Sequence, residues 1–218
     1  MITGQKVIAR VRRDFGRISA EDDKKIQESA RLLLDGVLGD DARIYPRLII
    51  KLAQGMGFTC FFAVFNDLNQ AGKLAVDPAL EERDSRYKGG RIILFDRQSS
   101  LAYKRLTIAT LLAHYVFDYN ERGKMTYYKV CSRTLESGAA SRRAARFAME
   151  LLMPTDDFLK KCDELEQVQG EAFSLPTTIT QLSRYFDVPV AAVRKRLEQI
   201  GRFQGQGGAV IISSSIDK

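Results

Sequence analysis

Residues 101–119 read LAYKRLTIATLLAHYVFDY, and this stretch decides the fold. It is the most hydrophobic helical pattern in the chain, with apolar residues at Ile108, Ala109, Leu112, Ala113 and Val116. Such a pattern predicts a helix that is buried on most of its sides. A helix of this kind needs covering layers, so the segments on either side of it must supply them.

Four further segments carry apolar residues at helical spacing or start with capping residues. They are residues 20–37, 45–56, 137–152 and 156–165. Asp22 and Asp23 favour the start of the first segment, Gly57 ends the second and Pro154 ends the third. Asp156 or Asp157 can cap the fourth segment.

Between these helices lie three segments that favour strands. Residues 58–65 and 91–95 are rich in β-branched and aromatic residues, and residues 73–76 follow a polar turn. We expect the first two strands along the chain to form a hairpin, and residues 77–88 to form an exposed loop. The chain therefore predicts an α+β fold in which helices pack on a small three-stranded antiparallel sheet.

The last third of the chain favours short helices. Residues 180–185 and 190–200 are joined around residues 187–189, which is helix-turn-helix spacing. Residues 209–212 of the Gly-rich tail are apolar enough to add an edge strand. We expect a main domain at 1–155, a helical segment at 156–203 packed on it, and a tail at 204–218.

The composition narrows the class of protein. The chain has 218 residues, 45% hydrophobic and 28% charged, which is typical of a globular protein. It has no run of about 20 apolar residues, so we expect no membrane span. Three cysteines without a CxxC pair favour reduced thiols in the cytoplasm. The net charge of +7 favours acidic partners, nucleic acid included.

Two stretches of sequence carry a resemblance to a known family. Residues 105–115, RLTIATLLAHY, are similar to a helix usually written RFTIAHELGHY, and residues 144–154, AARFAMELLMP, are similar to EANxFAxELLMP. These are the signatures of the ImmA/IrrE zinc metallopeptidases, in the family's order. The resemblance covers roughly residues 22–200 and implies a zincin-like fold.

Of the residues that bind or serve the metal in the family, this chain keeps only the second histidine. In an HExxH helix two histidines bind zinc and the glutamate is the general base. The matching positions here are Thr110, Leu111 and His114, and the position of the third ligand is Arg143. Threonine is a poor zinc ligand, leucine accepts no proton and arginine repels a dication. We therefore expect vestigial positions, no zinc and no other cofactor.

Without the metal, His114 is expected to be a partly buried imidazole hydrogen-bonded to a neighbour. Cys131 is the only cysteine with sequence support for a Cys-His pair with it, and a small buried side chain is the preferred interpretation of this cysteine.

The resemblance implies a regulatory role. Active members of the family are similar to phage and mobile-element proteins that cleave a helix-turn-helix repressor. Our leading hypothesis is an inactive relative, a pseudoprotease, that regulates such a repressor or another protein partner by binding it. Two alternatives stay open. One is DNA binding through residues 180–200, with Arg194, Lys195 and Arg196 on phosphates, and the other is a residual metallopeptidase.

Overall fold

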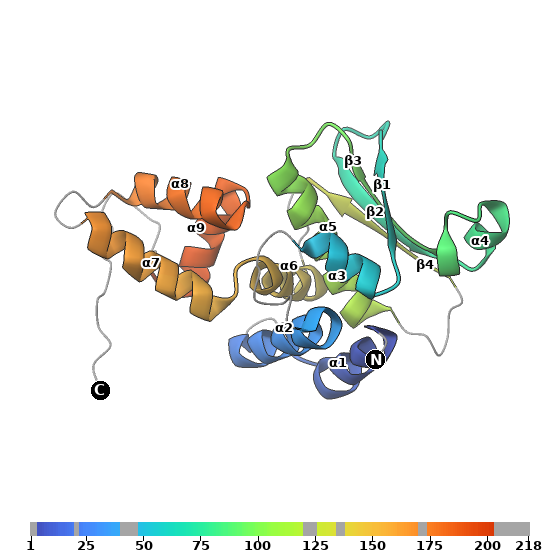
Figure 1. The fold of residues 1–218 in the computed structure, drawn as a ribbon, viewed down its shortest axis with the longest axis horizontal. Coiled ribbons are helices and arrows are strands. Elements are labelled where there is room, and N and C mark those ends of the chain that lie inside the picture. The colour runs from blue at the N-terminus through green and yellow to red at the C-terminus, as the bar shows by residue number, and fades with distance from the viewer. Residues whose placement is uncertain are drawn as a thin grey trace. The chain divides into compact units, whose positions relative to one another are not determined.

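The computed structural model describes residues 4–19, 22–39, 48–119, 126–133, 138–169 and 174–202. The chain divides into two compact units, Met1–Pro154 and Thr155–Lys218. Figure 1 shows the elements of both units in chain order.

The first unit contains five principal helices and a short one among the described residues. They are α1 (Gly4–Phe15), α2 (Asp23–Leu38), α3 (Ile49–Gly55), α4 (Ala79–Arg83), α5 (Leu101–Asp118) and α6 (Ala139–Leu152). The helices predicted at 20–37, 45–56, 101–119 and 137–152 correspond to α2, α3, α5 and α6, whose bounds differ from the predicted ones by a few residues. Helix α1 was not predicted, although its buried residues Val7, Ile8 and Val11 follow helical spacing.

Helix α5 is the centre of the first unit. Ser100 caps its start by accepting a hydrogen bond from the Tyr103 amide. Ile108, Leu111 and Leu112 are fully buried, so the prediction of a helix covered on most sides is confirmed. In Figure 1 the sheet lies on one side of α5, and α6 and α2 lie on another.

Within the described residues the sheet has four strands: β1 (Thr59–Ala63), β2 (Gln70–Val76), β3 (Arg91–Asp96) and β4 (Tyr127–Ser132). Their order is β1-β3-β2-β4, with β1 parallel to β3 and the other neighbours antiparallel. The predicted three-stranded antiparallel sheet is therefore wrong in strand number and in the direction of β1, and the predicted hairpin is wrong in pairing. β3 separates β1 from β2 because Ile92 and Ile93, on opposite faces of this strand, are both buried, as in an interior strand.

The segment predicted as an exposed loop, residues 77–88, contains helix α4, which has no buried residue. The segment is closed by Gly90, whose φ is +60° and whose carbonyl oxygen accepts a hydrogen bond from the Asp77 amide. A Cβ on Gly90 would lie 2.1 Å from the Asp77 carbonyl oxygen, so this position requires glycine.

The second unit contains α7 (Thr155–Gln169), α8 (Leu175–Phe186) and α9 (Val190–Gln199). Asp187 ends α8 in the left-handed region with φ +51°, and the hydroxyl of Ser183 donates to the Val188 carbonyl oxygen across the turn. The core of the unit includes Phe158 and Phe186. The tail expected at 204–218 lies outside the described residues. Among the helices that the structure describes, none has the length and apolar character that a bilayer crossing requires.

Candidate functional site

His114 lies on α5 with only 3% of its surface exposed. Its Nδ1 atom is 2.6 Å from Oδ2 of Asp118, one helical turn further along. This short contact between the imidazole and a carboxylate fixes the orientation of the ring. Asp118 was not singled out from the sequence.

Arg143, on α6, approaches the same carboxylate from the other side. Its Nη2 donates to Oδ1 of Asp118 at 3.0 Å, so Asp118 connects His114 to Arg143. The guanidinium also donates from Nη1 to the carbonyl oxygens of Gly16 at 3.3 Å and Ile18 at 3.5 Å. His114 and Arg143, the residues predicted to stand at two of the family's metal positions, are thus joined through one carboxylate, here called the His114–Asp118–Arg143 bridge.

The bridge controls the charge of its central residue. Burial alone would raise the pKa of the Asp118 carboxyl, but the hydrogen bond and charge of His114, with the charge of Arg143, lower it below the ordinary value of 3.8. The carboxylate is therefore ionised at neutral pH and neutralises the neighbouring guanidinium. The Phe117 ring, 4.8 Å from the Arg143 guanidinium, covers another side of that group.

The other two positions of the signature take part in packing. The Thr110 hydroxyl donates to the Leu106 carbonyl oxygen of its own helix at 2.9 Å. Leu111 is fully buried and faces β2 at Gly72, where a Cβ would lie 3.2 Å from the Leu111 side chain. Neither side chain is positioned as a proton acceptor.

The N-terminal segment covers the end of α5 that carries the bridge. Arg12 donates from Nε to the Val116 carbonyl oxygen at 3.0 Å and from Nη2 to that of Tyr115 at 2.7 Å. Its guanidinium lies 4.7 Å from the centre of the Tyr115 ring. A cation at a helix C-terminus satisfies its last carbonyl groups. No local pattern in the sequence indicates this role of Arg12, because its partners are about a hundred residues away.

None of the three cysteines, all of which are described, takes part in a disulfide bond. Burial raises the pKa of Cys60 to about 11 and that of Cys162 to about 12, so both are protonated at neutral pH. Cys131 lies on β4 with its Sγ 3.8 Å from the Ser132 carbonyl oxygen. Because Asp118 holds Nδ1 of His114, that nitrogen is not the partner of a thiol.

Within the described part of the chain, no three His, Cys, Asp or Glu side chains gather in a way that could hold a metal ion. His114 and Asp118 are adjacent, but Thr110, Leu111 and Arg143 contribute no further nitrogen, sulfur or carboxylate donor.

The basic residues of α9 differ in exposure. Arg196 is 5% exposed, and its Nη2 donates to Oγ1 of Thr155 at 2.7 Å. Arg194 is exposed and Lys195 is half-buried. Arg196, one of the three residues proposed to contact phosphates, is therefore buried and hydrogen-bonded within its own unit.

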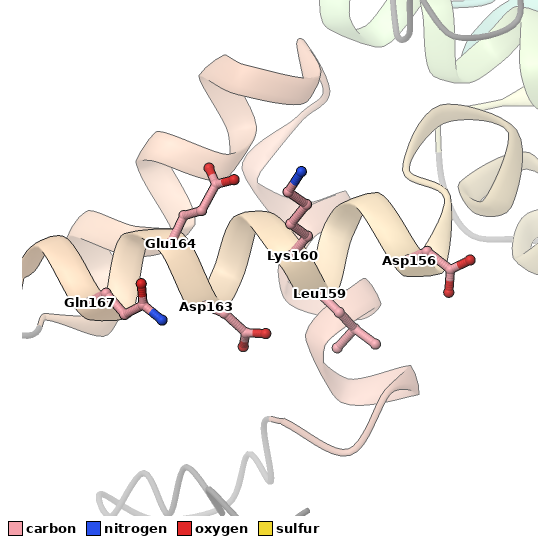
Figure 2. Close-up of a pocket in the computed structure, with 6 residues that line it drawn as sticks. All are labelled: Asp156, Leu159, Lys160, Asp163, Glu164 and Gln167. Atoms are coloured by element: carbon pink, nitrogen blue, oxygen red, sulfur yellow. The ribbon is translucent and has the colours of Figure 1, made fainter.

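Figure 2 shows a hollow along α7, lined by Asp156, Leu159, Lys160, Asp163, Glu164 and Gln167. All six residues come from one helix. Arg202 pairs with Asp163 at 2.6 Å, and Lys161 pairs with Glu164 at 2.9 Å. Two of the three carboxylates of this face thus take part in surface ion pairs.

Residues 70–198 match the sequence profile of the IrrE N-terminal-like domain. The match runs from the start of β2 into α9 and includes both His114 and Arg143. No curated protein matches the chain.

Proposed function

Because the chain belongs to the IrrE N-terminal-like family, we propose that it is a member without peptidase activity that regulates a protein partner by binding it. The observation that carries this proposal is the His114–Asp118–Arg143 bridge. It places a cation where the family signature has a carboxylate ligand.

The donor set around His114 does not fit a zinc ion. A catalytic zinc site takes three protein ligands and leaves one position for water or substrate. Here one imidazole remains, and the guanidinium bound to the neighbouring Asp118 carboxylate would repel a dication. Asp118 is already neutralised by Arg143, so recruiting it to a metal would break an existing ion pair.

The predicted position of the general base does not fit hydrolysis either. That position is Leu111, whose side chain accepts no proton and is fully buried. The hydroxyl of Thr110 is hydrogen-bonded within its own helix. Neither residue could activate a metal-bound water.

The partner we propose is a helix-turn-helix transcriptional repressor in a phage or mobile-element setting, met in the cytoplasm. This part of the proposal rests on the resemblance of residues 105–115 and 144–154 to the family signatures. A chain that keeps the family's scaffold but lacks its ligands can bind a repressor without cutting it.

Affinity purification from the source cells tests the proposal. The tagged chain should recover a DNA-binding regulator at its full length, and an unrelated protein with the same tag should not. Recovery of the regulator as cleaved fragments, with cleavage reproduced by the two purified proteins, would contradict the proposal.

DNA binding through residues 180–200 is the second candidate. The exposure of Arg194 and its half-buried neighbour Lys195 favours it. A gel shift at two salt concentrations tests it, because phosphate contacts make affinity fall steeply with salt. If this candidate is correct, Arg194→Ala weakens binding, whereas Arg13→Ala, which changes an exposed arginine of α1, does not.

A residual metallopeptidase is favoured by one observation, the Asp118 contact to Nδ1 of His114. Histidines that bind zinc commonly donate their other ring nitrogen to a carboxylate. Elemental analysis of the purified chain separates this candidate from the leading one, because only the residual peptidase requires bound metal.

A further inference from the structure

Strand β1 (Thr59–Ala63) forms one edge of the sheet built by the described residues. Natural edge strands usually carry a charge, a proline or a bulge that prevents pairing with another chain. β1 reads TCFFA and has none of these. The opposite edge strand, β4, contains Lys129 and pairs with β2 through a register shift. Of the two edges, β1 is the one without protection.

The backbone of Phe62 presents its polar groups to this free edge. The Ala63 carbonyl oxygen accepts a hydrogen bond from the Arg97 amide at 2.8 Å, on the β3 side. Polar backbone groups of consecutive strand residues point to opposite sides, so those of Phe62 point away from β3. An added strand would find a donor and an acceptor there.

Exposed apolar side chains gather around the same end of the sheet. β1 and β3 are parallel, so both end here, beside the turn of residues 96–100 (Figure 1). Exposed apolar residues in the segments that flank this turn include Phe62 (65% exposed), Val64 (69%), Leu68 (85%) and Leu101 (61%). An apolar group of this kind on a folded protein often marks a binding surface.

Side-chain contacts of Lys104 and Arg133 connect Phe62 and Leu68 to the turn. Lys104 donates to the Arg97 carbonyl oxygen at 2.8 Å and lies 5.2 Å from the centre of the Phe62 ring. Arg133 donates to the Leu68 carbonyl oxygen at 3.0 Å and to Asp96 at 2.6 Å. The apolar residues therefore belong to one surface, here called the β1 end.

The charge at the β1 end favours an acidic partner over a second copy. Arg133 and Asp96 neutralise each other. Arg97 is exposed and Lys104 lies over Phe62, whereas Asp67 is the one exposed carboxylate among described residues 58–69 and 96–104. Pairing of two β1 strands would bring these cations against their own copies, and like charges oppose association.

We propose that the β1 end binds an extended segment of a protein partner in which apolar residues are flanked by aspartate or glutamate. The segment adds a strand to β1, its backbone pairs with Phe62, and its carboxylates face Arg97 and Lys104. The inference rests on the proposed partner-binding function and gives it a location.

A synthetic peptide tests the surface without the natural partner. The probe is fluorescein-labelled EEVTVTVEE, and the controls are KKVTVTVKK and EEVTPTVEE, whose proline blocks strand pairing. Fluorescence anisotropy gives the affinity for the full-length chain, and amide NMR shifts locate the site. We expect saturable binding of the first peptide only, with shifts at residues 59–64.

Two matched valine substitutions test the location. Val64→Glu should weaken binding on the order of tenfold, since it places a carboxylate against the acidic flank. Val130→Glu on β4, where the valine is 45% exposed, should leave binding unchanged. Arg97→Gln should reduce the affinity and its salt dependence.

The proposal is overturned by equal binding of the lysine peptide, by no binding at all, or by equal effects of the two valine variants. It is also overturned if sedimentation shows a dimer that Val64→Glu dissociates, because a second copy then occupies the surface. Each of these results concerns the β1 end alone, so recovery of a regulator from cells would still support the proposed function.

Discussion

Asp118 on α5 and Arg143 on α6 form an ion pair with 3.0 Å between Oδ1 and Nη2. Under the proposed function, this ion pair stands in place of the family's attraction between a carboxylate and a metal. His114 contacts the other carboxylate oxygen of Asp118 and completes the bridge.

Removing the central carboxylate should destabilise the first unit. Asp118→Asn weakens two charged contacts in a partly buried place, and we expect a loss of about 1–3 kcal/mol in the free energy of unfolding. Urea denaturation measures it. The control Asp35→Asn, in an exposed pair with Arg31, should change stability by less than about 0.5 kcal/mol. Equal losses of unfolding free energy in the two variants would show that the bridge stabilises the fold no more than an exposed ion pair does.

The same residue predicts a pH dependence. The pKa of Asp118 is lower in the folded state than its ordinary value, so the unfolded chain binds the proton more readily. Its contribution to stability is complete above the ordinary value of 3.8 and is lost as the pH falls through the lower, folded pKa. The stability difference between wild type and Asp118→Asn should shrink on acidification from pH 6 to about pH 3. A difference that grows over this range would contradict the assignment.

Arg12 should hold the N-terminal helix in place. Arg12→Ala removes two hydrogen bonds to the end of α5, and we expect a loss of about 1–3 kcal/mol in unfolding free energy. Hydrogen exchange should increase in α1 first. Arg13→Ala is the control, because Arg13 is exposed and pairs with its chain neighbour Asp14. If Arg13→Ala loosens α1 as much as Arg12→Ala, the docking role is wrong.

The half-buried Cys60 and the buried Cys162 should react slowly with an alkylating reagent. Cys60, with a pKa of about 11 against an ordinary 9.0, forms about 100-fold less thiolate at pH 8 than an exposed cysteine. Iodoacetamide labelling followed by mass spectrometry should modify Cys60 and Cys162 rapidly in urea and slowly in the folded chain. Fast labelling of both in the native state would contradict their burial.

Local patterns were sufficient for most helices. The apolar density of residues 101–119 predicted the buried helix α5, and Gly57 and Pro154 marked boundaries near the ends of α3 and α6. These features depend on neighbouring residues in the chain, which a single sequence displays.

Pairings between distant segments could not be predicted in the same way. Turn residues 66–72 favoured a hairpin of β1 and β2. In the structure β3, which is buried on both faces, lies between these two strands and pairs with each of them. Strand β4 was not predicted. Its residues Tyr128, Lys129 and Val130 alternate between exposed and half-buried positions, so the strand has no fully buried face.

The site shows the same division. The sequence placed Thr110, Leu111, His114 and Arg143 at the family's metal positions, and the i+4 spacing of Asp118 from His114 was visible in it. The importance of Asp118 depends on where α6 presents Arg143, which is a tertiary property. Arg12 likewise depends on the docking of α1.

The central claim is that the His114–Asp118–Arg143 bridge replaces a metal site. The most direct test is elemental analysis of the full-length chain, purified without chelator and exchanged into zinc-containing and then zinc-free buffer. The account predicts far less than one zinc per chain. One zinc per chain that is lost on Asp118→Asn or His114→Ala would contradict it.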